Sequence, residues 1–259
     1  MAAPVAAIAS TSSASRVRFR VTFNFVMALL MAAIVIYGFS HTIGANLIHP
    51  SIPPPRLLYV HAALFTAFMG IYILQTGLIA SGNVALHQRL GRIWVVIGAA
   101  LPVVGVATVI VMRRFEFVHA HQDVAFQDVE FIGVLLWQML AFAILFLLAV
   151  LWRKRPEYHR RLMFLATCSL MSAGLSRFPL ATPAVPPANW FWYDFVGQYA
   201  GIAALVLIAM TRDLIVQHRV HIVYRVALPL MVIGFALACA LSDYHPAWWT
   251  ALSHRMLGV

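Results

Sequence analysis

The stretch PEYHRRLMFLATC, residues 156–168, has a His-Arg-Arg block directly before an apolar run. A looser copy, ALHQRLGRIWVV, begins at Ala85. Arginines that flank an apolar segment stay at the headgroups of a bilayer, where they bind phosphate while their stems lie along the acyl chains. The two stretches therefore predict two helices that start at the same side of a membrane.

The composition agrees with this interpretation. The chain has 259 residues, of which 63% are hydrophobic and 10% are charged, whereas about a quarter of the residues of a soluble domain are charged. A net charge of +10 would suggest nucleic-acid binding in a soluble protein. Here the arginines flank apolar segments, so the sequence predicts a membrane protein whose partners are lipids and not nucleic acid.

Seven runs are apolar enough to cross a bilayer core of about 30 Å, which takes about 20 residues. They are residues 23–40, 57–80, 93–112, 131–152, 162–178, 190–210 and 223–241. Since backbone polar groups cannot stay unpaired in lipid, these runs should be helices. The expected fold is all-α, a bundle of seven transmembrane helices over residues 21–245. A disordered cytoplasmic tail, 1–20, precedes it, and an external tail, 246–259, follows it.

The distribution of positive charge predicts the orientation, because loops rich in Arg and Lys stay in the cytoplasm. Of the 18 Arg and Lys residues, 13 fall on one side of the predicted bundle and 5 on the other. The N-terminus should therefore be cytoplasmic and the C-terminus external, in a multi-pass protein of a bacterial inner membrane.

The two blocks also carry a resemblance. The stretch HQRLGR at 87–92 and the stretch HRRLM at 159–163 resemble the LHRRLG and HRRLM helix starts of several families of uncharacterised bacterial multi-helix membrane proteins. From Tyr37 to its end the chain is similar to seven-helix members of these families. A smaller family with the HRRLM-type start is associated with maturation of haem-copper oxidases. The resemblance implies a respiratory complex as a candidate partner and implies no catalytic residue.

The blocks predict contacts to lipid headgroups through their basic side chains. These residues are His87, Arg89, Arg92, His159, Arg160 and Arg161. An alternative is that the repeated block marks a duplicated helix pair, which could form a site at its interface.

A second group of residues predicts a pocket open to the outside, because ionisable groups at membrane depth are costly and so are functional candidates. The helical period puts His61, Tyr72 and Gln75 on one face. The predicted pocket residues are His41, His61, Tyr72, Gln75, Asp128, Gln138, Arg177, Asp194 and Gln198. The alternative is that small residues only pack helices there and that Arg177 pairs with Asp194.

A candidate metal site is formed by His119, His121 and Asp123, which point to one side of an extended segment. Imidazole and carboxylate suit zinc, copper or iron. Haem is a further candidate cofactor, since axial ligation needs two histidines at matching depth. His41 and His61 share a depth on consecutive helices.

Three functions follow from these patterns. The first is a binding or redox-accessory protein whose external pocket holds a metal, haem or a small polar ligand. The second is a proton-coupled small-molecule transporter, for which charged or broken helices at the midplane would be typical. The third is a scaffold or assembly subunit of a respiratory complex. The patterns do not indicate an enzyme, and no GxSxG turn is present.

Overall fold

The computed structural model describes residues 19–119, 129–178 and 190–259, apart from the side chains of 190–194, Val196 and Gln198. The regular structure of these residues is helical throughout. The elements are α1 (Phe23–Ser40), η1 (Gly44–Ile48), α2 (Arg56–Ala80), α3 (Val84–His119), η3 (Val129–Phe131), α4 (Ile132–Leu151), α5 (Pro156–Ser169), α6 (Ser172–Leu175), α7 (Trp190–Gln217), α8 (Ile222–Tyr244) and α9 (Ala247–Leu257).

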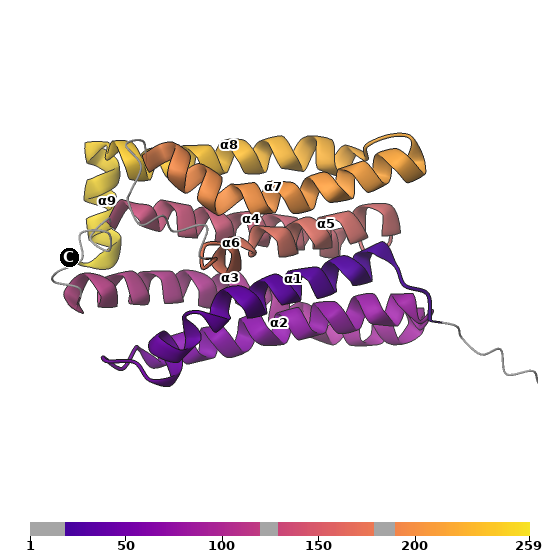
Figure 1. Ribbon diagram of the computed structural model, residues 1–259, viewed down its shortest axis with the longest axis horizontal. Helices are drawn as coiled ribbons and strands as arrows, with labels where there is room; N and C mark the ends of the chain where they lie inside the picture. The colour runs from indigo at the N-terminus through magenta and orange to yellow at the C-terminus, as the bar shows by residue number, and fades with distance from the viewer. Residues whose placement is uncertain (1–18, 120–128, 179–189) are drawn as a thin grey trace, which may run out of the picture.

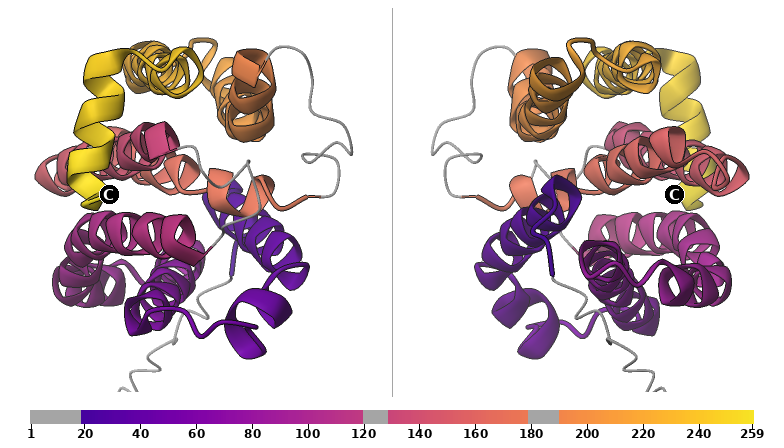
Figure 2. Two further views of the ribbon diagram at one scale, coloured as in Figure 1. Left: turned by 90° about the vertical axis from the view of Figure 1, so that its left-hand side faces the viewer. Right: turned by 90° about the vertical axis from the view of Figure 1, so that its right-hand side faces the viewer.

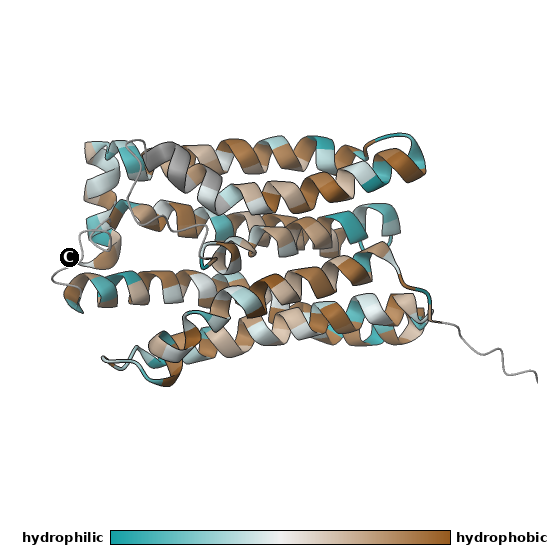
Figure 3. Cartoon of the chain, in the orientation of Figure 1, coloured by the Kyte–Doolittle hydropathy of each residue, from teal (hydrophilic) through white to brown (hydrophobic). Residues whose placement is uncertain are grey.

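The long helices run along one axis in three layers (Figures 1 and 2). α1, α2 and α3 form one outer layer, α7 and α8 form the other, and α4, α5 and α6 lie between them. The middle layer is the most enclosed: α5 is buried on all sides from Phe164 to Ser169, whereas α4 is buried except for one face, at Leu140, Ile144, Leu147 and Leu151. Hydrophilic residues gather toward the ends of the bundle (Figure 3).

Six helices in the described part of the chain are long and apolar enough to cross a membrane: α1, α2, α3, α4 with η3, α7 and α8. An all-helical, multi-pass membrane architecture agrees with this finding. The prediction of one continuous helix over 162–178 is wrong, because this segment forms two shorter helices, α5 and α6.

The hydrogen-bond pattern changes where α5 ends at Ser169. The Ser169 hydroxyl donates to the Ala166 carbonyl oxygen at 2.7 Å, the acceptor that the Leu170 N–H would use in a continuing α-helix. The Leu170 N–H donates instead to the Thr167 carbonyl at 3.2 Å, which tightens the last turn. The chain turns through Leu170 and Met171 before α6 begins.

The two ends of the bundle differ in character. α1 starts where α2 ends, and the Arg20 N–H donates to the Ala80 carbonyl at 2.9 Å. α3, α5 and α8 also start at this end, and α4 and α7 end there (Figure 1). We call it the basic end, because both His-Arg blocks lie there; the other is the opposite end.

α9 lies across the opposite end, roughly perpendicular to the bundle (Figure 1). The Trp249 indole N–H donates to the Glu130 carbonyl oxygen at 3.1 Å. Trp249 and Leu257 are buried against Val129 and Ile132. The segment predicted as a C-terminal tail is therefore a helix that packs on the bundle.

Candidate functional site

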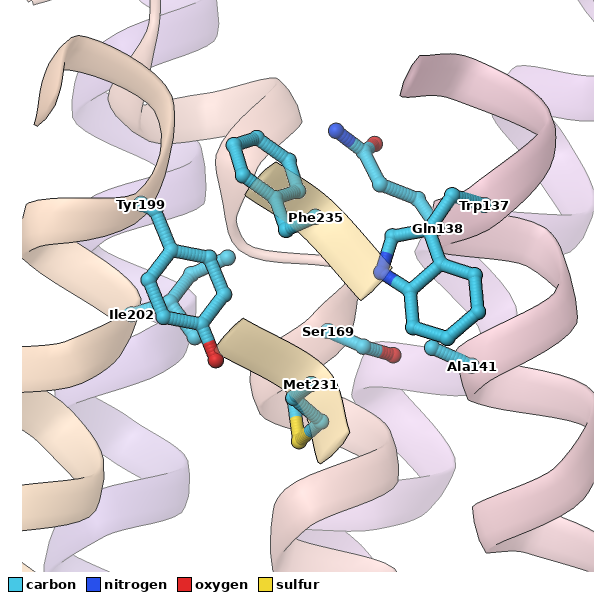
Figure 4. Close-up of a pocket in the computed structure, with 8 residues that line it drawn as sticks. All are labelled: Trp137, Gln138, Ala141, Ser169, Tyr199, Ile202, Met231 and Phe235. Atoms are coloured by element: carbon cyan, nitrogen blue, oxygen red, sulfur yellow. The ribbon is translucent and has the colours of Figure 1, made fainter. Parts of the chain in front are cut away.

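The break between α5 and α6 lies beside a small internal cavity (Figure 4). Side chains of α4, α5, α7 and α8 line it: Trp137, Gln138, Ala141, Ser169, Tyr199, Ile202, Met231 and Phe235. Its volume of about 10 Å³ is close to the smallest space that holds one water molecule. None of the lining residues carries a formal charge at neutral pH.

Polar groups that lack partners distinguish this region from an ordinary apolar core. Among the described residues, the buried hydroxyl groups of Tyr199 and Ser172 make no hydrogen bond. Tyr199 and Gln138 approach the cavity from opposite sides (Figure 4). Buried polar groups are nearly always hydrogen-bonded, so unpartnered ones indicate a space that receives water or another polar molecule.

A buried ion pair joins α5 to α7 at the basic end. The Arg161 guanidinium donates to both carboxylate oxygens of Asp213, with Nε–Oδ2 at 2.7 Å and Nη2–Oδ1 at 2.9 Å. The side chains of Arg161 and Asp213 are only 2% and 3% exposed. Arg161 Nη1 also donates to the Glu157 carboxylate at 2.7 Å and to the Glu157 carbonyl oxygen at 2.8 Å. Two parallel charge-assisted bonds satisfy a buried arginine that would otherwise be very costly.

Further charged and aromatic groups extend this pair toward water. Arg160 donates to Glu157 at 2.9 Å, and Arg212 lies 3.4 Å from the Asp213 carboxylate. The Tyr224 ring of α8 lies 6.0 Å from the Arg161 guanidinium carbon, so the network connects three helices.

The pKa values of two groups that lie outside the apolar, membrane-spanning segments, Glu157 and His221, are shifted by their surroundings. The hydrogen bond from Arg161 lowers the pKa of the Glu157 carboxyl, and Arg160 contributes in the same direction. Burial lowers the pKa of His221, and the positive charge of Arg161 lowers it further. His221 is therefore favoured in its neutral form, in which Nδ1 accepts from the Val223 N–H at 3.2 Å.

Asp213 is not among the residues predicted from the sequence, and Arg161 is predicted to contact lipid headgroups. The signal for Asp213 was that an acid stands within a long apolar segment, where an acid needs a cation. In the structure the Arg161 guanidinium is held by two carboxylates. The headgroup contacts of the other block residues stay a prediction.

The two histidines of the blocks lie together. The ring centroids of His87 and His159 are 6.2 Å apart. His159 Nδ1 lies 2.8 Å from the Ala149 carbonyl oxygen, which can only accept, so Nδ1 carries the proton. The Gln75 amide satisfies both of its neighbours when its nitrogen faces His87 and its oxygen faces Gly91. In this orientation the amide nitrogen donates to His87 Nδ1 at 2.6 Å and the amide oxygen accepts from the Gly91 N–H at 3.1 Å. Gln75 thus lies at the basic end.

The described members of the predicted external pocket lie in separate regions. Gln75 is at the basic end, and Gln138 lines the internal cavity. Tyr72 is 5% exposed, in the core. The ring of His41 is edge-on to Tyr37 at 4.8 Å.

His61 and Arg177 come near one another at the opposite end. His41 also lies there, since Tyr37 contacts both His41 and Phe178. His61 stacks on Phe65 with centroids 4.1 Å apart, and the Arg177 guanidinium lies 4.2 Å from the centroid of Phe39. Arg177 is within electrostatic range of both His61 and Glu116. Asp128 and the side chains of Asp194 and Gln198 lie outside the described residues.

The predicted metal site cannot be followed beyond its first residue. His119 ends α3, with Nδ1 2.8 Å from the Phe115 carbonyl oxygen, and both His121 and Asp123 lie outside the described residues. Within the described ranges, no group of three or more His, Cys, Asp or Glu side chains could hold a metal ion. The metal and haem hypotheses receive no support from this part of the chain.

No family model, curated protein or solved structure matches the chain.

Proposed function

We propose that the protein is a membrane transporter for a small, uncharged polar solute. The observation that carries this proposal is the interruption of the fifth apolar segment beside a cavity that is lined by the unpartnered hydroxyl group of Tyr199. Interrupted helices near mid-membrane are typical of transporter binding sites, since irregular backbone is tolerated in a bilayer where it lines a cavity.

The cavity lining supports the choice of an uncharged solute. Gln138 offers an amide and Tyr199 a hydroxyl group, and neither carries a charge to balance that of an ion. Trp137, Tyr199 and Phe235 provide apolar surface around these polar groups, as in most small-molecule sites. The cavity must widen for a solute larger than water, and the turn at Leu170 and Met171 offers a point about which α5 and α6 can move.

The binding or redox-accessory function is supported less well, because the described residues of its external pocket lie in separate regions. We keep, as part of the proposal, a bacterial inner membrane, seven crossings, a cytoplasmic N-terminus and an external C-terminus. The excess of arginine at the basic end supports this orientation. The partnership with a respiratory complex stays a prediction from the resemblance.

Reswelling of proteoliposomes after an osmotic shock tests the proposal, with glycerol and urea as solutes. We expect protein-containing vesicles to take up at least one of them faster than empty vesicles. Gln138→Leu should slow uptake by about tenfold, because a lost hydrogen bond of about 1.4 kcal/mol has this effect on a rate. Gln75→Leu, the same change away from the cavity, should leave uptake unchanged.

A negative result is equally clear. Uptake no faster than in empty vesicles, with both solutes and across an imposed pH gradient, would contradict the transport proposal. The pH gradient also tests coupling to protons, since uptake that depends on it indicates a proton-coupled carrier.

A further inference from the structure

The buried ion pair lies on the same helices as the cavity. Arg161 is about 12 Å from Ser169 along α5, and Asp213 is about 16 Å from Ile202 along α7, at about 1.5 Å per residue. In both cases the ion-pair residue is the one nearer the basic end. Tyr224 lies in the same direction from Met231 on α8. A seam between α5, α7 and α8 therefore leads from the cavity to the ion pair.

Apolar side chains fill this seam. Leu165 of α5 and Val206 of α7 are fully buried, and Ala209, one turn from Asp213, is 1% exposed. All three belong to the main hydrophobic core. Beyond them, toward the basic end, lies the buried Arg161–Asp213 pair, and nearer still to that end of α5 are Glu157, which is 57% exposed, and Arg160, which is 34% exposed.

We propose that the Arg161–Asp213 ion pair closes the basic end of the transport path and opens when α5 and α7 separate. This inference rests on the proposed transport function. According to this proposal, the structure represents the state in which the basic end is closed. The turn at Leu170 and Met171 is then the hinge about which α5 moves.

The surroundings of the pair suit an interaction that breaks and re-forms. Removing one partner of a buried ion pair is costly because it leaves a buried charge alone. Here Arg161 and Asp213 each have a second charged partner that is more exposed to water and that remains bound when the pair separates. Arg161 is also bound by Glu157, which is 57% exposed, and Asp213 also lies near Arg212, which is 34% exposed. Separation of the helices therefore leaves neither charge unpaired.

Cys168 is a natural reporter for this opening. It is next to Ser169, it is fully buried, and its thiol is free. The test is the rate at which a small, membrane-impermeant methanethiosulfonate labels Cys168 in vesicles of known orientation, with reagent on one side at a time. The variant Cys168→Ser identifies any labelling of Cys239, the second cysteine of the chain.

Asp213→Asn and Arg161→Lys both weaken the bidentate pair, and either should raise labelling from the basic side by about tenfold or more. Labelling from the opposite side should not change. Glu157→Gln is the matched control, because it removes a carboxylate from Arg161 but keeps the bond to Asp213. The exchanged variant, Arg161→Asp with Asp213→Arg, should restore slow labelling.

Two results would overturn the inference. One is unchanged basic-side labelling in Asp213→Asn and Arg161→Lys proteins that retain cooperative melting. The other is labelling that rises equally from both sides together with a lower melting temperature, which describes a pair that only stabilises the fold. Labelling needs no solute, so the closure can fail while solute uptake stands, and uptake can fail while the closure stands.

Discussion

The imidazole rings of His87 and His159, from the two copies of the His-Arg block, lie with their centroids 6.2 Å apart. His159 also donates to the Ala149 carbonyl near the end of α4. The start of α5 is thereby attached to α4 and packed beside the start of α3. The repeated block thus joins three helices at the basic end, in addition to its predicted contacts with headgroups.

Loss of one member of the buried ion pair should strongly destabilise the fold. Asp213→Ala removes two buried charge-assisted bonds from Arg161, which keeps only its bonds to Glu157, and this should cost about 3 kcal/mol. The measurement is the free energy of unfolding from a denaturant titration in detergent. Arg160→Ala, which removes a more exposed pair with Glu157, should cost about 1 kcal/mol or less. Similar losses in the two variants would argue against this assignment.

Stability should fall as the pH drops from about 7 to about 5, in part through His221. Burial lowers the pKa of His221 in the folded protein, so between the folded and unfolded pKa values the unfolded chain binds more protons. His221→Asn keeps an N-cap acceptor without titrating in this range, and should flatten the dependence of melting temperature on pH. His218→Asn, at an exposed position, is the control and should leave the slope as in the wild type.

Gly38 and Gly174 should tolerate no side chain where α1 crosses α6. A Cβ atom on Gly38 would lie 2.8 Å from the carbonyl carbon of Gly174, which is backbone and cannot rotate away. Gly38→Ala should therefore destabilise the protein by about 1–3 kcal/mol. Gly70→Ala adds the same methyl group where nothing lies within 4 Å, and should be neutral or slightly stabilising. Equal melting temperatures for the two variants would count against this close contact.

The variant Tyr199→Phe should reduce solute uptake without lowering the stability of the protein. The Tyr199 hydroxyl is buried without a partner, so its removal should leave the melting temperature unchanged or higher. If the hydroxyl binds solute, uptake of glycerol or urea should fall in the same protein. Tyr59→Phe removes a hydroxyl that bonds to the Leu47 carbonyl, outside the cavity. Wild-type uptake by Tyr199→Phe, or an equal loss with Tyr59→Phe, would show that this hydroxyl does not serve transport.

A reporter fused after Val259 tests the orientation. We expect alkaline phosphatase at this position to be active and green fluorescent protein to be dark, since folding of the former needs the external side and the latter fluoresces on the cytoplasmic side. The charge distribution is the reason for this expectation. The opposite pair of signals would reverse the orientation and would make the basic end external.

The long spans could be predicted from the sequence, because apolar runs of membrane length determine them. The run at 23–40 coincides with α1, and the run at 223–241 lies within α8. The interruption at Leu170 could not be predicted from apolar character, since residues 162–178 are apolar on both sides of it. There the Ser169 hydroxyl bonds to the Ala166 carbonyl and the Leu170 N–H bonds to the Thr167 carbonyl, local contacts that apolar character does not predict.

The candidate site was predicted only in part, for a related reason. Gln138 is predicted to reach a pocket open to the outside, and in the structure it lines the internal cavity. Helical phase on one helix does not show which helices face each other. Gln75 and Tyr72 share a face of α2, yet Gln75 contacts His87 while Tyr72 lies in the core. The partner of Arg161 stands 52 positions along the chain, and only tertiary packing brings the two together.

The fifth segment has a consequence for how the chain enters the bilayer during synthesis. α5 has only 14 residues, and it carries Arg161 among its buried positions. An arginine at the centre of an inserting helix costs about 2.5–3.5 kcal/mol, and its counter-ion, Asp213, leaves the ribosome only after α7 has been translated. We expect this segment to be retained in the membrane late, by α7, so that the fifth crossing becomes permanent only when the sixth has arrived.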